Sequence, residues 1–249
     1  MTSKLTLGAL SALALLTVGA SAQATNLVQN GGFETTTLSG SSEFGTRFAG
    51  QQVANWTTGG YNFLFMPNTA DTSGAASEYG PVSMWGPHNG SANGFTSTSP
   101  DGGNFIAADP SYAQGPIQQT ITGLVAGQKY VLSFDWAGVQ QHDFDGPTTE
   151  GWDVSLGGET HSAAPVANAN HGFTGWMHST MTFTATSASE TLSFLATGGP
   201  SGSQPPFSLL DGISLISGVP EPATWGLMIM GFGLIGATAR RRRAALAAA

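Results

Sequence analysis

Few residues of this 249-residue chain have the types and spacing that catalysis needs. There is no cysteine, so no thiolate can act as a nucleophile or metal ligand and no disulfide can brace the fold. The five histidines lack metal-ligand spacing, and residues 25–219 hold no G-x-S-x-G, H-E-x-x-H or phosphate-loop motif. Glycoside hydrolysis needs two carboxylates across a cleft, and the scattered acids cannot be paired from sequence. We therefore expect no enzymatic activity and keep a hydrolase or esterase as a distant alternative.

Charged residues are distributed unevenly along the chain. Residues 25–219 contain only two basic residues, Arg47 and Lys129, against fourteen acidic ones, a formal net charge of −12. Such a surface repels polyanions, which argues against nucleic acid and anionic lipid as ligands. Neutral glycans and divalent cations remain as candidates.

One acidic cluster follows the strand expected at residues 128–137. It comprises Asp143, Asp145, Glu150 and Asp153. The cluster lacks the D-x-D-x-D-G spacing of a calcium loop, so we interpret it as a solvated loop rather than a cation site.

Aromatic side chains that strand alternation leaves outside the core are candidates for stacking on sugar rings. Trp136 and Trp152 fall on core-facing positions and are expected to pack. Trp85, beside a Gly-Pro-His loop, and Trp176 with His178 are the candidate ligand contacts. A bulge near Gly175 would turn Trp176 inward instead, and that alternative stays open.

The elements that must position these residues read as strands. Residues 128–137 alternate Tyr130, Leu132, Phe134 and Trp136 with more polar neighbours, and residues 152–156 and 181–185 alternate in the same way. Phe207, Leu209, Ile213 and Leu215 are assigned to one inner face of the last strand. Abundant glycine and proline between short strands favours an all-β, antiparallel sandwich. Residues 67–103 are expected to form long loops with one strand near 82–85.

The N-terminus has the pattern of a secretory signal peptide. Lys4 precedes an apolar run over residues 5–20, and Ala22-Gln23-Ala24 supplies the small residues that a signal peptidase reads. We expect residues 1–24 to be removed by signal peptidase, which would make Thr25 the mature N-terminus. Cleavage after Ala20-Ser21-Ala22 is the second choice.

The C-terminal segment combines a Pro-Glu-Pro sequence, an apolar run and four arginines. Residues 223–239 carry no charge and would form a transmembrane helix about 25 Å long. Trp225 and the basic cluster would anchor its two ends at the interfaces, the latter comprising Arg240, Arg241, Arg242 and Arg243. The arginines should stay cytoplasmic with residues 244–249, which places residues 25–218 outside the cytoplasm as a single domain.

The segment 219–243 resembles the PEP-CTERM sorting signal of exported bacterial proteins. The resemblance rests on Pro220, Glu221, Pro222, Trp225 and the terminal arginines, in matching order and spacing. It implies a temporary anchor in the inner membrane that an exosortase cuts near the Pro-Glu-Pro sequence, followed by release or attachment at the cell surface. A permanent C-terminal anchor is the alternative.

A second resemblance extends along most of residues 25–218. Residues 26–34, 56–60, 101–109, 117–138 and 209–216 are similar, in order, to the galactose-binding-like jelly roll of carbohydrate-binding modules. That resemblance implies a structural Ca²⁺ held by Glu34, Asp211 and a carbonyl such as that of Gly32. Calcium prefers several oxygen ligands, and a bridge between the first and last strands would brace a fold without disulfides. Ordinary solvated acids at strand ends are the equal alternative.

Together these patterns predict an exported surface or extracellular-matrix protein. Its expected role is non-catalytic binding of a neutral exopolysaccharide, as in a biofilm. A purely structural matrix protein without sugar affinity is the close alternative.

Overall fold

The computed structural model describes residues 25–48, 50, 52–200, 204–218, 230–233 and 235. Residues 230–233 and 235 are helical, and the rest of the described chain is strand, turn and loop. Its strands are β1 (Ser42–Glu43), β2 (Thr57–Thr58), β3 (Asn62–Phe65), β4 (Phe105–Ala108), β5 (Ile117–Thr122), β6 (Lys129–Gln140), β7 (Thr148–Leu156), β8 (Glu159–Asn168), β9 (Met177–Thr184), β10 (Ser189–Gly199) and β11 (Pro206–Ser217).

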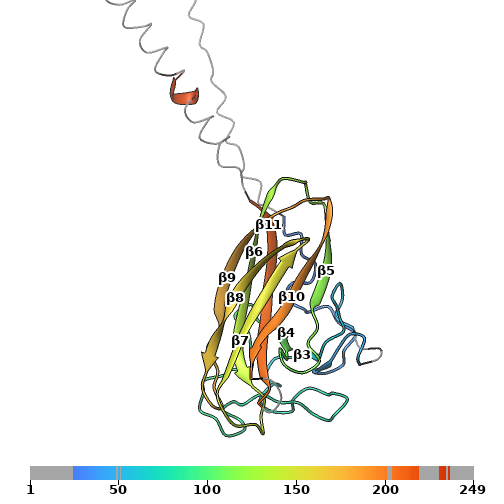
Figure 1. The fold of residues 1–249 in the computed structure, drawn as a ribbon, viewed down its shortest axis with the longest axis vertical. Coiled ribbons are helices and arrows are strands. Elements are labelled where there is room, and N and C mark those ends of the chain that lie inside the picture. The colour runs from blue at the N-terminus through green and yellow to red at the C-terminus, as the bar shows by residue number, and fades with distance from the viewer. Residues whose placement is uncertain are drawn as a thin grey trace, which may run out of the picture.

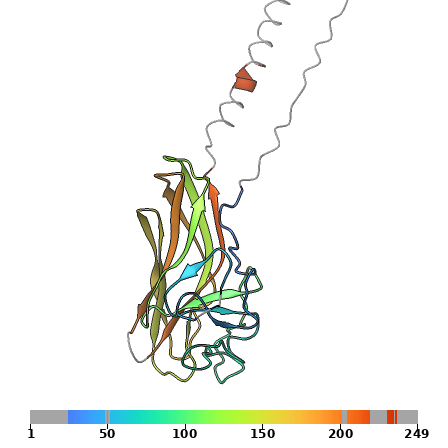
Figure 2. The same cartoon turned by 90° about the vertical axis from the view of Figure 1, so that its right-hand side faces the viewer.

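These strands form two antiparallel sheets that face each other (Figure 1). The six-stranded sheet has the order β1-β3-β4-β11-β6-β9, and the five-stranded sheet has the order β2-β5-β10-β7-β8. The predicted all-β antiparallel sandwich is therefore confirmed. The N-terminal segment runs beside the last strand, where the Leu27 amide donates to the Leu215 carbonyl at 2.8 Å (Figure 2).

The main hydrophobic core lies between the two sheets because each strand turns alternate side chains inward. Tyr130, Leu132, Phe134 and Trp136 of β6 are buried there, as their alternation predicts. Trp152 of β7 is fully buried and donates its indole N–H to the Leu209 carbonyl at 3.1 Å. The packing roles predicted for Trp136 and Trp152 are confirmed.

A second core lies on the outer face of the six-stranded sheet. The side chains of Phe63, Phe65, Phe105 and Phe207 point away from the main core and bury against residues 66–104, which supply Ala70, Ala75, Val82, Met84 and Phe95. The loops of this segment gather at the lower end of the molecule (Figures 1 and 2). The long loops expected here therefore form a third layer. The strand expected at residues 82–85 is wrong, since only isolated bridges form, at Val82 and Met84.

The last strand changes face partway along its length. The register between β11 and β6 shifts between Asp211 and Ser214, and Gly212 has φ of +60°. Phe207 and Leu209 therefore belong to the second core, whereas Ile213 and Leu215 belong to the main core. Assigning all four to one inner face is wrong, because a bulge adds residues and reverses the alternation after it.

The predicted terminal segments lie largely outside the described residues. The signal peptide over residues 1–24 and the sorting residues Pro220, Glu221, Pro222, Trp225 and Arg240 to Arg243 are among those not described. Within the described ranges, no helix combines the length and apolarity needed to cross a bilayer.

Candidate functional site

The predicted cation ligands meet at one corner of the sandwich, beside the bulge of β11. Gly32 lies close to two of the carboxylates: a Cβ atom at this position would be 3.0 Å from Asp101 Oδ2 and 3.9 Å from Asp211 Oδ1. The Glu34 carboxylate accepts a hydrogen bond from the Asn104 amide at 2.7 Å, and its charge acts on Asp211. The structure thus brings Gly32, Glu34 and Asp211 together and adds Asp101.

Asp211 is the least satisfied group at this corner. Its side chain is fully buried; Oδ2 accepts the Ser99 hydroxyl, and Oδ1 has no hydrogen-bond partner among the described residues. Burial, with the neighbouring charges of Asp101 and Glu34, raises the pKa of Asp211 to about 8. A buried carboxylate oxygen without a partner is costly unless a proton or a cation satisfies it. No group of three or more His, Cys, Asp or Glu in the described ranges converges as metal ligands, so carbonyl oxygens would have to complete a site.

The aromatic candidates chosen from sequence have partners of their own. The Trp85 ring stacks on His171, with centroids 3.8 Å apart, and contacts His142 at 4.2 Å. Trp176 packs partly buried against the second core, 5.9 Å from the Phe105 ring, and donates its indole N–H to the Thr98 carbonyl at 2.9 Å. Gly175 before it has φ of +79°, in line with the inward alternative. Ligand contact by Trp85 and Trp176 stays a prediction.

His178, the third candidate, points to solvent from β9. Its side chain is 61% exposed, and Nδ1 lies 2.8 Å from Asp135 Oδ1. A ligand role for His178 also stays a prediction.

The second acidic cluster is dispersed. Asp143 and Asp145 have side chains more than four-fifths exposed and pair with His142 and His171. Glu150 instead turns into the core beside Gly138, fully buried. Its Oε1 accepts the Thr148 hydroxyl, Oε2 has no partner among the described residues, and burial raises its pKa to about 7. A solvated position is therefore wrong for Glu150, because the alternation of β7 places it on the inner face.

A cleft of about 290 Å³ at the side of the second core gathers three tyrosines. Tyr61 stands just before β3, Tyr112 follows β4, and Tyr79 comes from the long loop segment. The Tyr61 ring lies edge-on to Tyr112 at 5.2 Å, and the Tyr79 and Tyr112 hydroxyl oxygens lie 2.8 Å apart in a hydrogen bond. We call this the tyrosine cleft; its lining is Tyr61, Tyr79, Asp109, Ser111, Tyr112, Gln141, Phe144 and Pro205.

Two of these tyrosines face solvent. Tyr79 is 67% exposed and Tyr112 is 45% exposed, whereas Tyr61 is buried. In the described part of residues 25–218, no other phenylalanine, tyrosine or tryptophan is exposed to this degree. The hydrogen bond to Tyr112 raises the pKa of Tyr79 to about 12, so its phenol is neutral at physiological pH. The cleft therefore offers apolar ring surface together with neutral hydroxyls.

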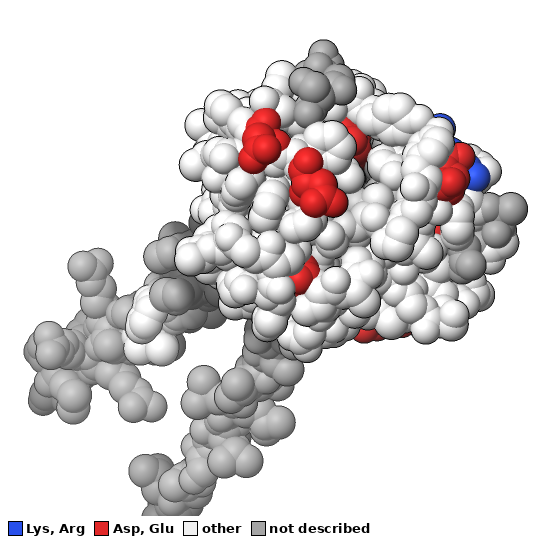
Figure 3. All heavy atoms as spheres, turned by 90° about the horizontal axis from the view of Figure 1, so that it is seen from below, with Lys and Arg blue, Asp and Glu red and all other residues white. Residues whose placement is uncertain are grey.

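The polar groups around the rings are held in place. Asp109 Oδ1 accepts hydrogen bonds from the Ser111 and Tyr112 amides at 2.7 and 2.9 Å, and burial raises the pKa of Asp109. The Arg47 guanidinium lies 5.9 Å from the centroids of Tyr61 and Tyr112 and pairs with Glu43 and Glu78. Seen from the lower end, the surface is mostly uncharged, with acids in scattered positions and basic atoms beside acidic ones at one edge (Figure 3).

The sequence did not predict the tyrosine cleft, because strand alternation identifies exposed aromatic side chains only within strands. Tyr79 and Tyr112 lie in loops, where no alternation marks a side chain as exposed. The available signal was local: each tyrosine is flanked by turn formers and small residues, in Ser-Glu-Tyr-Gly-Pro and Pro-Ser-Tyr-Ala. The contact between the two loops arises only from the fold.

Comparison with known proteins gives a family match at the C-terminus and a longer match to another protein over most of the chain. Residues 218–243 match the PEP-CTERM protein-sorting motif. The motif implies an exported, membrane-processed protein that an exosortase handles. Halomucin from Haloquadratum walsbyi is 29% identical over 202 residues, 79% of this chain; the chain spans about 2% of that protein's length.

Solved structures similar to this chain include carbohydrate-binding modules. A CBM61 module in complex with β-1,4-galactotriose aligns over 78% of this chain and 99% of its own, with a TM-score of 0.44 and 16% identity. The CBM22-2 xylan-binding domain from Paenibacillus barcinonensis aligns over 72% of this chain and 98% of its own, with a TM-score of 0.36 and 11% identity.

Proposed function

We propose that this protein is an exosortase-sorted surface protein that binds a neutral exopolysaccharide through the tyrosine cleft, without catalysis. The observation that carries the proposal is the pair of exposed, hydrogen-bonded tyrosines, Tyr79 and Tyr112. Exposed aromatic rings beside fixed polar groups are typical of binding sites, because they lose little conformational entropy when a ligand covers them. Sugar rings present C–H faces to such rings and hydroxyls to the polar groups.

The charges around the cleft favour a neutral ligand. Arg47, the nearest cation, is already paired with Glu43 and Glu78, and Asp109 lines the cleft wall. These four groups carry a negative balance, which would repel uronate or phosphate groups on a ligand. Asp109 is also the only carboxylate that lines the described cleft, whereas glycoside hydrolysis requires two.

Binding measurements with matched variants test the proposal. Purified full-length protein would be titrated calorimetrically with galactan, xylan and cellulose oligosaccharides, and with a polyuronate as the charged control. We expect binding to at least one neutral glycan, none to the polyuronate, and a loss of at least about tenfold in affinity for Tyr79→Ala/Tyr112→Ala. Trp85→Ala and Trp176→Ala are the comparison variants. A loss of glycan affinity in these variants alone would mean that the sugar binds outside the tyrosine cleft.

The alternative function is a purely structural matrix role without sugar affinity. It predicts no measurable binding to any of the glycans, together with disturbed matrix architecture in a deletion strain. Turnover of a model glycoside or ester, abolished by Asp109→Asn, would instead establish a hydrolase.

We further propose that Glu34 and Asp211, with carbonyl oxygens such as that of Gly32, hold one structural Ca²⁺ beside Asp101. The support is the buried Asp211 Oδ1, which has no protein partner in the described residues, beside two further carboxylates. A bound cation would neutralise this group and tie the N-terminal segment to β11. We expect Ca²⁺ to raise the melting temperature and a chelator to lower it, with the response lost in Asp211→Asn and kept in Asp143→Asn. An unchanged melting temperature in the presence of a chelator would contradict calcium binding.

The processing route is proposed from the sorting motif. Signal peptidase would cut after Ala24, and the exosortase near Pro220 to Pro222, after transient residence in the inner membrane. Mass spectrometry of the protein recovered from the cell surface should find both new ends. A surface protein that retains Arg240 to Arg243 would favour the permanent anchor.

A further inference from the structure

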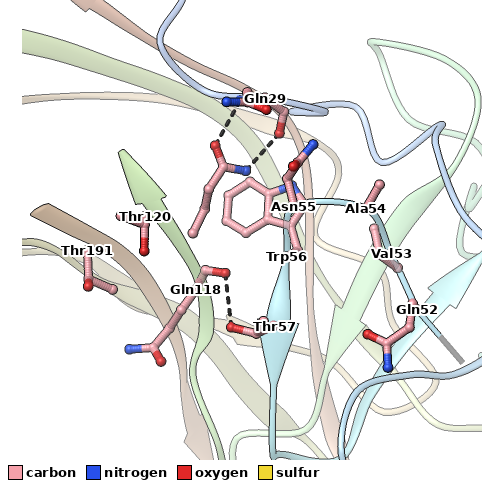
Figure 4. Close-up of a pocket in the computed structure, with 11 residues that line it drawn as sticks. Gln29, Gln52, Val53, Ala54, Asn55, Trp56, Thr57, Gln118, Thr120 and Thr191 are labelled. Atoms are coloured by element: carbon pink, nitrogen blue, oxygen red, sulfur yellow. Dashed lines mark hydrogen bonds between the residues drawn. The ribbon is translucent and has the colours of Figure 1, made fainter. Parts of the chain in front are cut away.

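A second hollow, of about 540 Å³, lies on the outer face of the five-stranded sheet (Figure 4). Thr57 of β2, Gln118 and Thr120 of β5 and Thr191 of β10 form its floor, since their neighbours Thr58, Ile117, Ile121 and Leu192 point into the core. Gln29 and residues 52–56 form its walls. We call it the amide hollow.

The lining of the amide hollow contains carboxamides and hydroxyls but no ionisable side chain. Its polar groups belong to Gln29, Gln52, Asn55, Thr57, Gln118, Gln119, Thr120 and Thr191. A carboxamide offers donors and an acceptor together, as a sugar hydroxyl does. An ion would find no counter-charge here, and an apolar ligand would leave the amides unpaired. The chemistry therefore fits a neutral, hydroxyl-rich ligand.

Part of the hollow is fixed and part is free to bind. The Gln119 side chain makes two hydrogen bonds to the Gln29 backbone, at 2.8 and 2.7 Å, which hold the wall against β5 (Figure 4). In contrast, the side-chain amides of Gln52 and Asn55 form no hydrogen bond with any described residue. The side-chain amide of Gln118 makes only one, to the Ser193 hydroxyl at 3.4 Å. A rigid wall with unused amides is preorganised for hydrogen bonds to a ligand.

The amide hollow and the tyrosine cleft open on opposite layers. Tyr61 shares the outer face of the six-stranded sheet with Phe63 and Phe65, whereas Thr57 and Thr120 lie on the outer face of the other sheet. Facing sheets are about 10 Å apart, so the body of the sandwich separates the two sites. Both could hold a chain at the same time.

We propose that the amide hollow is a second, independent site for neutral carbohydrate, and that one molecule therefore cross-links two polysaccharide chains. The inference shares its ligand class with the proposed function but rests on separate residues. Two weak sites on one body would raise the apparent affinity for a polymer well above that for a short oligosaccharide.

NMR of the ¹⁵N-labelled full-length protein tests each site separately. The probes are β-1,4-galactotriose, xylotriose and cellotriose, and the reporters are the side-chain amide signals of Gln52 and Gln118 and the indole N–H of Trp56. Thr120→Tyr fills the hollow, and Thr182→Tyr, at an exposed threonine of β9, is the matched control. Melting temperatures of both variants verify the fold.

We expect at least one sugar to shift the hollow's signals in the wild type, in Thr182→Tyr and in Tyr79→Ala/Tyr112→Ala, but not in Thr120→Tyr. Light scattering with the corresponding polymer should rise for the wild type and fall several-fold when either site is lost. Silence of the hollow's signals with all three sugars would overturn the inference even if the cleft binds. A response in the hollow without binding at the cleft would support the second site while refuting the proposed role of the tyrosines.

Discussion

The two outer faces of the sandwich are built from the same alternation but present different surfaces. On the six-stranded sheet, the outward positions of β3, β4 and the adjoining halves of β6 and β11 are phenylalanines and aliphatic residues, and residues 66–104 cover them to make a second core. On the five-stranded sheet, the outward positions of β5 and β10 are mostly threonine, serine and glutamine, with Leu195 among them, and they are exposed or partly exposed. One face therefore gains stability by burial, whereas the other keeps its hydrogen-bonding groups available.

This difference explains where the two proposed sites lie. The tyrosine cleft forms at the margin of the covered face, where the rings of Tyr79 and Tyr112 extend beyond the second core. The amide hollow forms on the bare face, against the edge strand β2. Aromatic stacking should dominate in the cleft, and hydrogen bonds should dominate in the hollow.

The largest expected effect is the loss of a ring from the second core. Phe105 is fully buried and contacts Phe65, Phe95 and Trp176. We expect Phe105→Ala to lower the free energy of unfolding by about 3–5 kcal/mol. Thr191→Ala, on the bare face, should change it by less than about 0.5 kcal/mol. Denaturant unfolding measures the free energy of unfolding of both variants. Similar losses in the two would contradict the difference in burial between the two faces.

An intermediate effect should come from the buried acid of β7. The pKa of Glu150 in the folded protein is about 7, above its usual 4.5, so the folded state retains a proton that the unfolded state releases. The contribution of Glu150 to the free energy of unfolding should therefore fall as the pH rises from about 4.5 to about 7 and then level off, while Asp211, with a pKa of about 8, adds a separate fall up to that pH. Glu150→Gln removes the contribution of Glu150 and should stabilise the protein on the order of 1–3 kcal/mol at pH 8.

The control for this pH dependence is on the same strand. Asp153 points outward and is partly exposed, so Asp153→Asn is the matched loss of a carboxylate outside the core. Thermal unfolding between pH 4 and pH 8 compares the three proteins. Parallel profiles for wild type and Glu150→Gln would contradict the assignment.

The smallest effect concerns a single hydroxyl. Tyr79→Phe keeps the ring but removes the 2.8 Å hydrogen bond to Tyr112, both partners being exposed. We expect the free energy of unfolding to change by less than about 0.5 kcal/mol. Glycan affinity should fall far less than in Tyr79→Ala, because the ring surface remains. Equal losses of affinity in the two variants would mean that the hydroxyl, rather than the ring, makes the contact.

The strands and the main core were predictable because they depend on local alternation. Tyr130 to Trp136, Trp152 and Val154 were placed correctly, since a half-buried strand repeats every two residues. The bulge at Gly212 was not predictable, because alternation read from sequence assumes an unbroken strand. One shift in register reverses the face of every later side chain. That error put Phe207 and Leu209 on the wrong face and concealed the second core.

The candidate sites were predictable only in part. Glu34 and Asp211 were paired through a resemblance, and the structure does bring them to one corner, yet Asp101 joins from a loop without periodicity. Tyr79 and Tyr112 are 33 residues apart in sequence, and their contact depends on how the long segment folds over β3 and β4. Such contacts follow from tertiary packing, which single-residue patterns do not encode.

The four tyrosines of the chain allow the most direct test of the cleft. Full-length protein labelled with ¹³C only at tyrosine would be titrated with β-1,4-galactotriose, xylotriose and cellotriose. We predict that one sugar shifts the ring signals of Tyr79 and Tyr112, while Tyr130, buried in the main core, stays unchanged. Unchanged Tyr79 and Tyr112 signals with every sugar would contradict carbohydrate binding at the tyrosine cleft.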